Sequence, residues 1–580
     1  MNRWTMTACA LIAACAPMAS AQQVEVEEFT LDNGMKFLLV PRHDAPNSIA
    51  AGWLAKVGSV NERPGITGIS HFFEHMMFKG TTTIGTDNAN ADRRIIDNLA
   101  ATRDDLLDLQ MTVQYPRWKS GEIDDPWDAA NDTPKMAELR QRMRDLQEEQ
   151  RTHTVKDEFD QVYTSMGGSS MNAFTSEDVT FYFITVPSNK FELWAWMESD
   201  RLTDSVFREF YSERDVVHEE RRLRTESTPT GKYQEQFESM FWMSSPYNWP
   251  VIGWTSDLNS YTRADAEAYY DTYYRPNNLV GVIVGDFDPA YIKPVINRYF
   301  SRLEAGPTPP PVVTLEMEQQ AEMRMFAEGD LQPQVEVRYH AVPFGHKDGY
   351  ALEMMSEILN GRTGRLYKNL VEGKEIASNA FAGQDQRKYA GAFSFSAQTK
   401  GDATPEDLEQ GWYEVLGDLQ ENLVSERELQ KVKNGVAADS FRRLQNNFFL
   451  LVQLGYLEAL GDWKELNEGP KILDAITAED IREVANKYFD KTNRSVAIYT
   501  RSEDAAPIDP ELAALDPQMQ GMVKQFTTQF TKITNATEMS EMIGMLKSQM
   551  GNAPANYQPA VKIIMSKAHE RLAELEAAQD

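Results

Sequence analysis

Cysteine is almost absent from this chain of 580 residues. Its two cysteines, Cys9 and Cys15, both lie within the first 21 residues, in a segment with the features of an export signal. A mature chain without that segment has no disulfide and no cysteine-ligated zinc. Any metal in the mature chain must therefore be held by histidine, aspartate and glutamate.

Positive charge is also scarce. The chain has 58 lysines and arginines against 88 aspartates and glutamates, a net charge of −30. Nucleic-acid binding is disfavoured, because the basic surface that neutralises phosphates is missing. The acidic surface is explained by solvation, although it would also attract basic segments of a partner.

The N-terminal segment, MNRWTMTACALIAACAPMASAQQ, has no apolar run long enough to span a bilayer. One basic residue, a short apolar run and small residues at 19 and 21 predict a secretory signal over residues 1–21, removed after Ala21. Alternatively, IAAC at 12–15 resembles a bacterial lipobox, in which Cys15 would carry the lipid. Both interpretations predict a periplasmic or secreted protein without a transmembrane segment.

The remaining chain predicts an α+β fold of two related halves, each with a mixed sheet packed against helices. Two similar stretches, YYDTYYRPNNLVGVIVG and VANKYFDKTNRSVAIYT, close the segments before and after the Pro-rich linker EAGPTPPPVV. The expected limits are an N-terminal domain at 22–303 with a helical insertion at about 86–162, a linker at 304–316, a C-terminal domain at 317–500 and a Met-rich helical tail at 501–580.

Histidine is rare as well, with eight in the chain, yet two of them stand in the five-residue stretch HFFEH. On a helix His71 and His75 are at i and i+4, on one face, where two imidazoles can bind one Zn²⁺. Glu74 lies close enough to take a proton from a water on the metal. The alternative is an ordinary helix face that carries two histidines and binds no metal.

A hydrolytic zinc site also needs a third ligand. The segment SERDVVHEERRLR offers Glu213 and Glu220, which are seven residues apart and share one helix face. Glu219 is the competing candidate for the ligand.

The stretch GITGISHFFEHMMFKGT resembles the signature of the inverted-zincin M16 peptidases, the insulinase, pitrilysin and mitochondrial-processing-peptidase group. The resemblance continues through GGSSMNAFTSEDVTFYF, SERDVVHEE, YYRPNNLVGVIVGDFDP and LNGRTGRLYKNLVEG, and it covers most of residues 25–500. It implies a clam-like arrangement of the two halves.

The resemblance also implies roles for individual residues. His71, His75 and Glu220 would bind one Zn²⁺ per chain, Glu74 would act as the general base, and Glu213 would be a supporting acid beside the site. The chain would then be a zinc-dependent endopeptidase that cuts peptides or unfolded protein segments.

In this family a strand along the cleft pairs with an extended substrate. The corresponding strand here is MNAFTSEDV, and its candidate substrate-binding residues are Asn172 and Ala173. An ordinary buried strand is the alternative interpretation of that segment.

Two features depart from the family pattern. Glu220 follows His75 by 145 residues, about twice the usual interval, and the helical insertion accounts for the excess. Many family members also carry an Arg and a Tyr, seven residues apart, in the second half. Val371 and Ser378 occupy those positions here, and neither can contact a developing oxyanion in the same way.

The missing Arg and Tyr predict that the chain works as a homodimer, or as a heterodimer with another M16-like chain. Two alternatives to an independent peptidase follow: a zinc-binding subunit that is latent until its partner supplies these residues, and a non-catalytic scaffold subunit.

Overall fold

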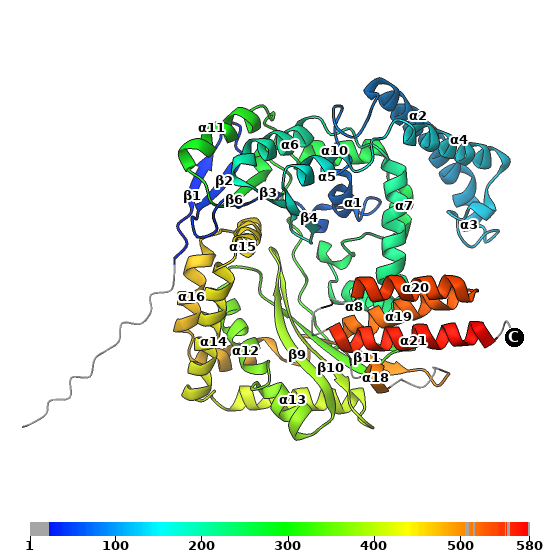
Figure 1. Ribbon diagram of the computed structural model, residues 1–580. Helices are drawn as coiled ribbons and strands as arrows, with labels where there is room; N and C mark the ends of the chain where they lie inside the picture. Colours follow the sequence, from blue (N-terminus) through cyan, green and yellow to red (C-terminus); the bar gives the residue numbers. More distant parts are fainter. Residues whose placement is uncertain are drawn as a thin grey trace, which may run out of the picture.

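The computed structural model describes residues 23–504, 510–513, 515, 517–550, 553 and 557–577. The predicted signal peptide, with Cys15, lies outside the described residues. The described residues form two mixed sheets covered by helices, together with a helical hairpin and a C-terminal helical bundle (Figure 1). No helix among them is long and apolar enough to cross a membrane.

The first sheet has six strands in the order β1-β2-β6-β3-β5-β4. Only β2 and β6 run parallel, and the other neighbours are antiparallel. Its strands are β1 (Glu27–Thr30), β2 (Lys36–Pro41), β3 (Ile49–Ala55), β4 (Ser169–Thr175), β5 (Thr180–Val186) and β6 (Leu279–Gly285). The helices of this half are α1 (Ile69–Met76), α6 (Phe191–Thr203), α7 (Phe210–Arg221), α8 (Gly231–Phe241), α9 (Thr255–Ser260), α10 (Arg263–Tyr273) and α11 (Pro289–Phe300).

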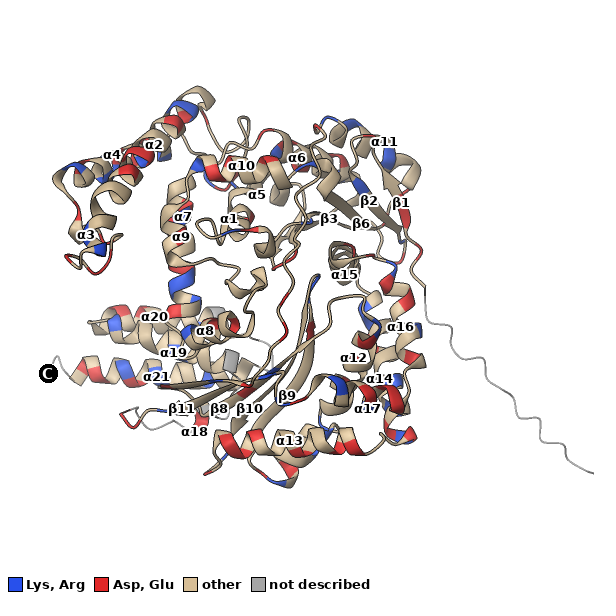
Figure 2. Cartoon of the chain, turned by 180° about the vertical axis from the view of Figure 1, so that it is seen from behind, with Lys and Arg blue, Asp and Glu red and all other residues tan. Residues whose placement is uncertain are grey.

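The helical insertion projects from this half, at the upper right of Figure 1. Its projecting part contains α2 (Ala89–Leu109), α3 (Tyr115–Lys119) and α4 (Pro134–Arg151), whereas α5 (Glu158–Ser165) lies against β4 of the first sheet. Apolar residues at helical spacing on α2 and α4, including Ile95, Leu99, Leu139 and Leu146, join the core of the first half. Acidic and basic residues are interleaved along surface helices such as α4 and α21 (Figure 2).

The second sheet repeats the first but has no counterpart of strand β1. Its order, β7-β11-β8-β10-β9, matches β2-β6-β3-β5-β4 in both connection and strand direction. The strands are β7 (Met323–Gly329), β8 (Gln334–Ala341), β9 (Ala377–Gln386), β10 (Gly391–Thr399) and β11 (Arg494–Arg501). The helices are α12 (Lys347–Leu359), α13 (Pro405–Glu421), α14 (Glu426–Leu444), α15 (Asn447–Leu460), α16 (Glu465–Ala475) and α17 (Ala478–Tyr488). The predicted fold class, two related α/β-layered halves, is confirmed.

The two halves exchange helices, which the sequence did not predict. Helix α15 belongs to the second half but packs on the first sheet, where Leu450 and Leu454 join a core with Leu38 and Val282. Helix α8 belongs to the first half, and its Phe237 is buried among residues of β7 and β11 in the second sheet. Each half therefore completes the core of the other, and the linker is not their only connection.

The linker and the tail are the remaining parts. Residues 304–320 contain no helix or strand, but the Glu316 carboxylate accepts hydrogen bonds from the backbone N–H groups of Met243 and Ser245 at 2.9 and 2.8 Å. The tail contains α18 (Pro510–Ala513), α19 (Pro517–Lys532), α20 (Ala536–Met550) and α21 (Gln558–Ala577), which enclose a core of their own. The exact domain limits stay predictions.

Candidate metal centre

Helix α1, which carries HFFEH, is fixed at its N-terminus by a buried carboxylate. Glu62 accepts hydrogen bonds from the backbone N–H groups of Gly68 and Ser70, both at 2.7 Å. These are N–H groups of the first helical turn, which have no partner within a helix. Gly68 has a φ of +87°, and a Cβ there would lie 2.4 Å from the carbonyl oxygen of Ile252. The chain therefore enters α1 in a conformation that only glycine adopts easily.

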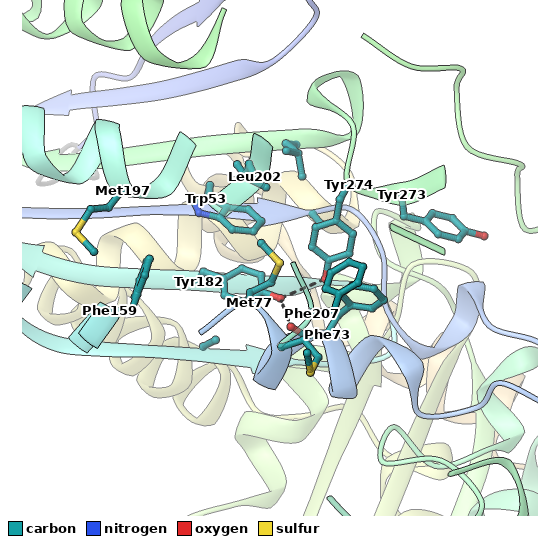
Figure 3. Close-up of a cluster of buried hydrophobic side chains, with 14 of the residues drawn as sticks. Trp53, Phe73, Met77, Phe159, Tyr182, Met197, Leu202, Phe207, Tyr273 and Tyr274 are labelled. Carbon is teal, nitrogen blue, oxygen red and sulfur yellow. Dashed lines mark hydrogen bonds between the residues drawn. The ribbon is translucent and has the colours of Figure 1, made fainter. Parts of the chain in front are cut away.

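The inner face of α1 is held by an aromatic cluster (Figure 3). Phe73 packs against Phe207 and Tyr274, with ring centroids 5.3 Å apart in both pairs. The Tyr182 hydroxyl from β5 donates to the Phe73 carbonyl at 3.2 Å. With this face fixed in the core, the histidine face of the same helix is directed toward α7.

Helix α7 brings Glu220 to the histidines. Oε2 of Glu220 lies 3.3 Å from Nε2 of His75 and 3.7 Å from Nε2 of His71. Glu219, the competing candidate, pairs with Arg222 at 2.7 Å instead. Within the part of the chain that the structure describes, His71, His75 and Glu220 form the one cluster of such side chains close enough to share a metal ion.

These three residues fit a zinc ion. Zinc–ligand bonds of about 2.0–2.2 Å at tetrahedral angles place ligand atoms roughly 3.3–3.6 Å apart. The two distances from Glu220 Oε2 to the imidazole nitrogens, 3.3 and 3.7 Å, are close to this range. Two imidazoles and one carboxylate are also a donor set that zinc accepts in catalytic sites, which keep a fourth position open.

A second layer orients His75. Its Nδ1 lies 2.9 Å from Oε1 of Glu213, a residue that is only 8% exposed. Oε2 of Glu213 pairs with the Lys79 ammonium at 2.5 Å. Such a carboxylate fixes the tautomer and ring orientation of a ligating histidine. Nδ1 of His71 is buried and has no hydrogen-bond partner among the described residues, so the two histidines are not equivalent.

The protonation of the site follows from these contacts. Burial lowers the pKa of His71, and the charge of the neighbouring His75 lowers it further. Burial also disfavours the charged form of His75, but hydrogen bonds to Glu213 and Glu220 outweigh it and raise the pKa to about 9. Burial would raise the pKa of Glu213, but its hydrogen bonds and charge interactions with His75 and Lys79 outweigh burial and lower that pKa.

Glu74 stands beside this cluster at the edge of the first sheet. Its Oε2 accepts a hydrogen bond of 2.8 Å from the Thr175 hydroxyl, at the end of β4. Burial raises the pKa of Glu74, and the Thr175 bond opposes that change. Strand β4 is the last in the sheet order, with Asn172 exposed and Ala173 buried on it. Thr175 was not predicted, because its contact with Glu74 joins residues 101 positions apart.

The described residues of the second half form no matching site. Helix α12 follows β8 as α1 follows β3, but α12 contains no histidine. Val371 packs against the core of that half, and the Ser378 hydroxyl on β9 donates to the carbonyl of Gln398 at 3.3 Å. Arg365, from the motif LNGRTGRLYKN, pairs with Asp418 and Glu428, which is a structural role.

The repeated fold and the two-histidine, one-glutamate cluster agree with the resemblance to the inverted-motif metallopeptidases. Residues 39–101 match the family model described as Insulinase (Peptidase family M16), and residues 260–436 match the Peptidase M16 inactive domain. Both models describe domains of peptidase family M16, and the predicted resemblance to that family is confirmed.

Two of its curated relatives are named zinc proteases. Zinc protease PqqE of Helicobacter pylori is 26% identical over 485 residues, 82% of this chain and 92% of the relative. The uncharacterized zinc protease YmxG of Bacillus subtilis is 22% identical over 80% of this chain and 96% of its own.

Solved structures share the fold. A protease from Helicobacter pylori superimposes with a TM-score of 0.66 at 24% identity, covering 82% of this chain and 99% of the other. The periplasmic protease PqqL from Escherichia coli gives a TM-score of 0.61 at 17% identity, over 84% of this chain but 49% of PqqL. The described residues therefore correspond in fold to about half of PqqL.

Proposed function

We propose that the chain is a zinc-dependent endopeptidase acting on peptides or unfolded protein segments. The observation that carries the proposal is the convergence of His71, His75 and Glu220 beside the carboxylate of Glu74. The three converging residues would hold one zinc ion. When bound, zinc would lower the pKa of a water molecule and polarise a peptide carbonyl.

Glu74 supplies the proton transfers. Its carboxylate takes the proton from the attacking water and then gives it to the leaving amine. The hydrogen bond from Thr175 holds that carboxylate at the end of β4, and burial favours its protonated form. Glu213 acts through His75, whose ring it orients.

The substrate binds as an extended strand. Because β4 is the last strand of the sheet, its outer edge is free to pair with another strand by backbone hydrogen bonds. The exposed Asn172 and the neighbouring Ala173 are the proposed contacts. This edge leads to Thr175 and Glu74, so a peptide paired with β4 passes the metal centre.

The active assembly is a homodimer, or a heterodimer with another M16-like chain, in the periplasm or outside the cell. With Val371 and Ser378 in the second half, this chain lacks the Arg and Tyr that many relatives place there. PqqL, which is called periplasmic, is about twice as long as the matching part of this chain. Cleavage after Ala21 and lipid attachment at Cys15 remain alternative modes of processing.

The test is hydrolysis of a quenched fluorescent peptide library by the full mature chain, with its zinc content measured in the same preparation. Chelator-sensitive cleavage, lost in Glu74→Gln while zinc is retained, supports an independent peptidase. A zinc-loaded but inert chain supports the second candidate, a subunit that requires a partner, which the residues Val371 and Ser378 favour. Cleavage by Glu74→Gln at the unaltered rate refutes the proposal.

A further inference from the structure

A π-turn follows the metal centre along α7. The helix continues beyond Arg221 into residues 222–226, where the Ser227 N–H donates to the Arg222 carbonyl at 2.8 Å. Single π-turns are frequent at functional sites. Two arginines of this turn pair with two successive glutamates of α7: Arg222 with Glu219 at 2.7 Å, and Arg224 with Glu220 at 2.6 Å.

The two oxygens of Glu220 have different partners. Oε2 faces the imidazoles of His71 and His75, whereas Oε1 is bound by the guanidinium of Arg224. An oxygen held by a charged donor fixes the direction of the other oxygen, since the carboxylate is planar. Partners of this kind orient metal ligands, and their loss typically weakens metal binding about 10–100-fold.

We propose that Arg224 is the positioning residue for Glu220 and sets the zinc affinity of the site. This inference rests on the proposed function, because it takes Glu220 as the third ligand. The side chain of Arg224 is 74% exposed and lines a cavity of about 450 Å³ between the two halves. Exposed ion pairs contribute little to folding. The effect of Arg224 is therefore on the metal and not on the stability of the chain.

Two effects of Arg224 on zinc oppose each other. The positive charge of Arg224 repels the zinc ion, so removal of that charge would tighten zinc binding. That repulsion is weakened by water and salt, because the guanidinium is largely exposed. The ion pair with Glu220 is direct, with 2.6 Å between Arg224 Nη1 and Oε1, whereas the carboxylate lies between the guanidinium and the two imidazoles. Orientation therefore outweighs repulsion, and the loss of Arg224 weakens zinc binding.

Arg222 provides a matched control. It belongs to the same π-turn, is exposed, and pairs with a glutamate that does not face the histidines. Arg224→Ala, Arg224→Lys and Arg222→Ala are compared in the full mature chain by zinc competition with a chromophoric chelator. We expect about tenfold weaker binding for Arg224→Ala and no change for Arg222→Ala. Arg224→Lys should recover part of the loss, because lysine keeps the charge without the planar fork.

Two further measurements separate this role from a general defect. The visible spectrum of the Co²⁺-substituted chain depends on ligand geometry, so it should change in Arg224→Ala and not in Arg222→Ala. Thermal unfolding of the metal-free variants should match the unaltered chain. If Arg224→Ala binds zinc as tightly as the unaltered chain, or more tightly, the role of Arg224 is overturned and the proposed function is not affected. An unaltered chain that binds no zinc overturns the proposed function as well.

Discussion

Helix α15 crosses the first sheet at a glycine, and this contact makes the exchange of helices testable. A Cβ on Gly455 would lie 2.6 Å from Cε1 and 2.8 Å from Cζ of Phe181, and 3.0 Å from Leu54. The Phe181 ring is fully buried, and its centroid lies 5.9 Å from that of Phe174 and 5.7 Å from that of Phe183. The ring cannot move aside without displacing these neighbours.

Gly455→Ala therefore brings two opposing changes in the free energy of unfolding. Alanine favours a helix interior over glycine by about 0.8–1 kcal/mol. Overpacking of a filled core costs about 1–3 kcal/mol, and the contact at 2.6 Å is far inside ordinary van der Waals distance. We expect a net destabilisation of up to about 2 kcal/mol.

Gly435 is the matched control in α14, because a Cβ added there would have no atom of the described residues within 4 Å. Gly435→Ala has the helix-propensity gain alone and should stabilise the chain by up to about 1 kcal/mol. Urea unfolding followed by tryptophan fluorescence and circular dichroism gives both values. Equal stabilisation by the two substitutions would refute the close packing of α15 on the first sheet.

Two further substitutions test the second layer of the metal centre and the contact between the halves. Glu213→Ala leaves His75 Nδ1 without its partner and should weaken zinc binding about 10–100-fold in chelator competition; unchanged affinity would contradict the orienting role. Burial lowers the pKa of His340, which stacks on Phe241 with ring centroids 4.0 Å apart. Below about pH 6.5 the unfolded chain therefore binds more protons than the folded chain, and stability falls as the pH falls. His340→Phe should reduce this loss between about pH 7.5 and 5.5 in urea unfolding, and an unchanged loss would show that His340 is not its source.

The local arrangement of the candidate metal centre could be predicted from the sequence. The spacing of His71 and His75 sets their common helix face, and the seven-residue interval between Glu213 and Glu220 does the same on α7. The contacts of Thr175 and Lys79 could not be predicted in this way. Thr175 contacts Glu74 from the end of β4, and Lys79 contacts Glu213 from the turn after α1. Neither contact follows from the spacing of residues along one helix.

The exchange of helices could not be predicted either. The sequence of α15, NFFLLVQLGYLEAL, is apolar on most sides, which is typical of a buried helix. Such a pattern does not say which sheet covers the helix, and proximity in the chain favours its own half. Local sequence does not indicate the place of β7 in its sheet either, since β7 pairs with β11, whose residues follow it by about 170 positions.

The two halves share the same sheet connections, but among the described residues only the first half has the histidines that could bind a metal. Helices α1 and α12 follow corresponding strands of two sheets with the same connections, so both halves offer the same position for a metal-binding helix. Helix α12 carries no histidine, and its residues Leu352 and Met355 are fully buried in the core of the second half. The second half keeps the packing and lacks the candidate ligands, while its α15 completes the core of the half that has them. The second half therefore contributes to the candidate metal centre through packing, because it supports the sheet whose last strand leads to Glu74.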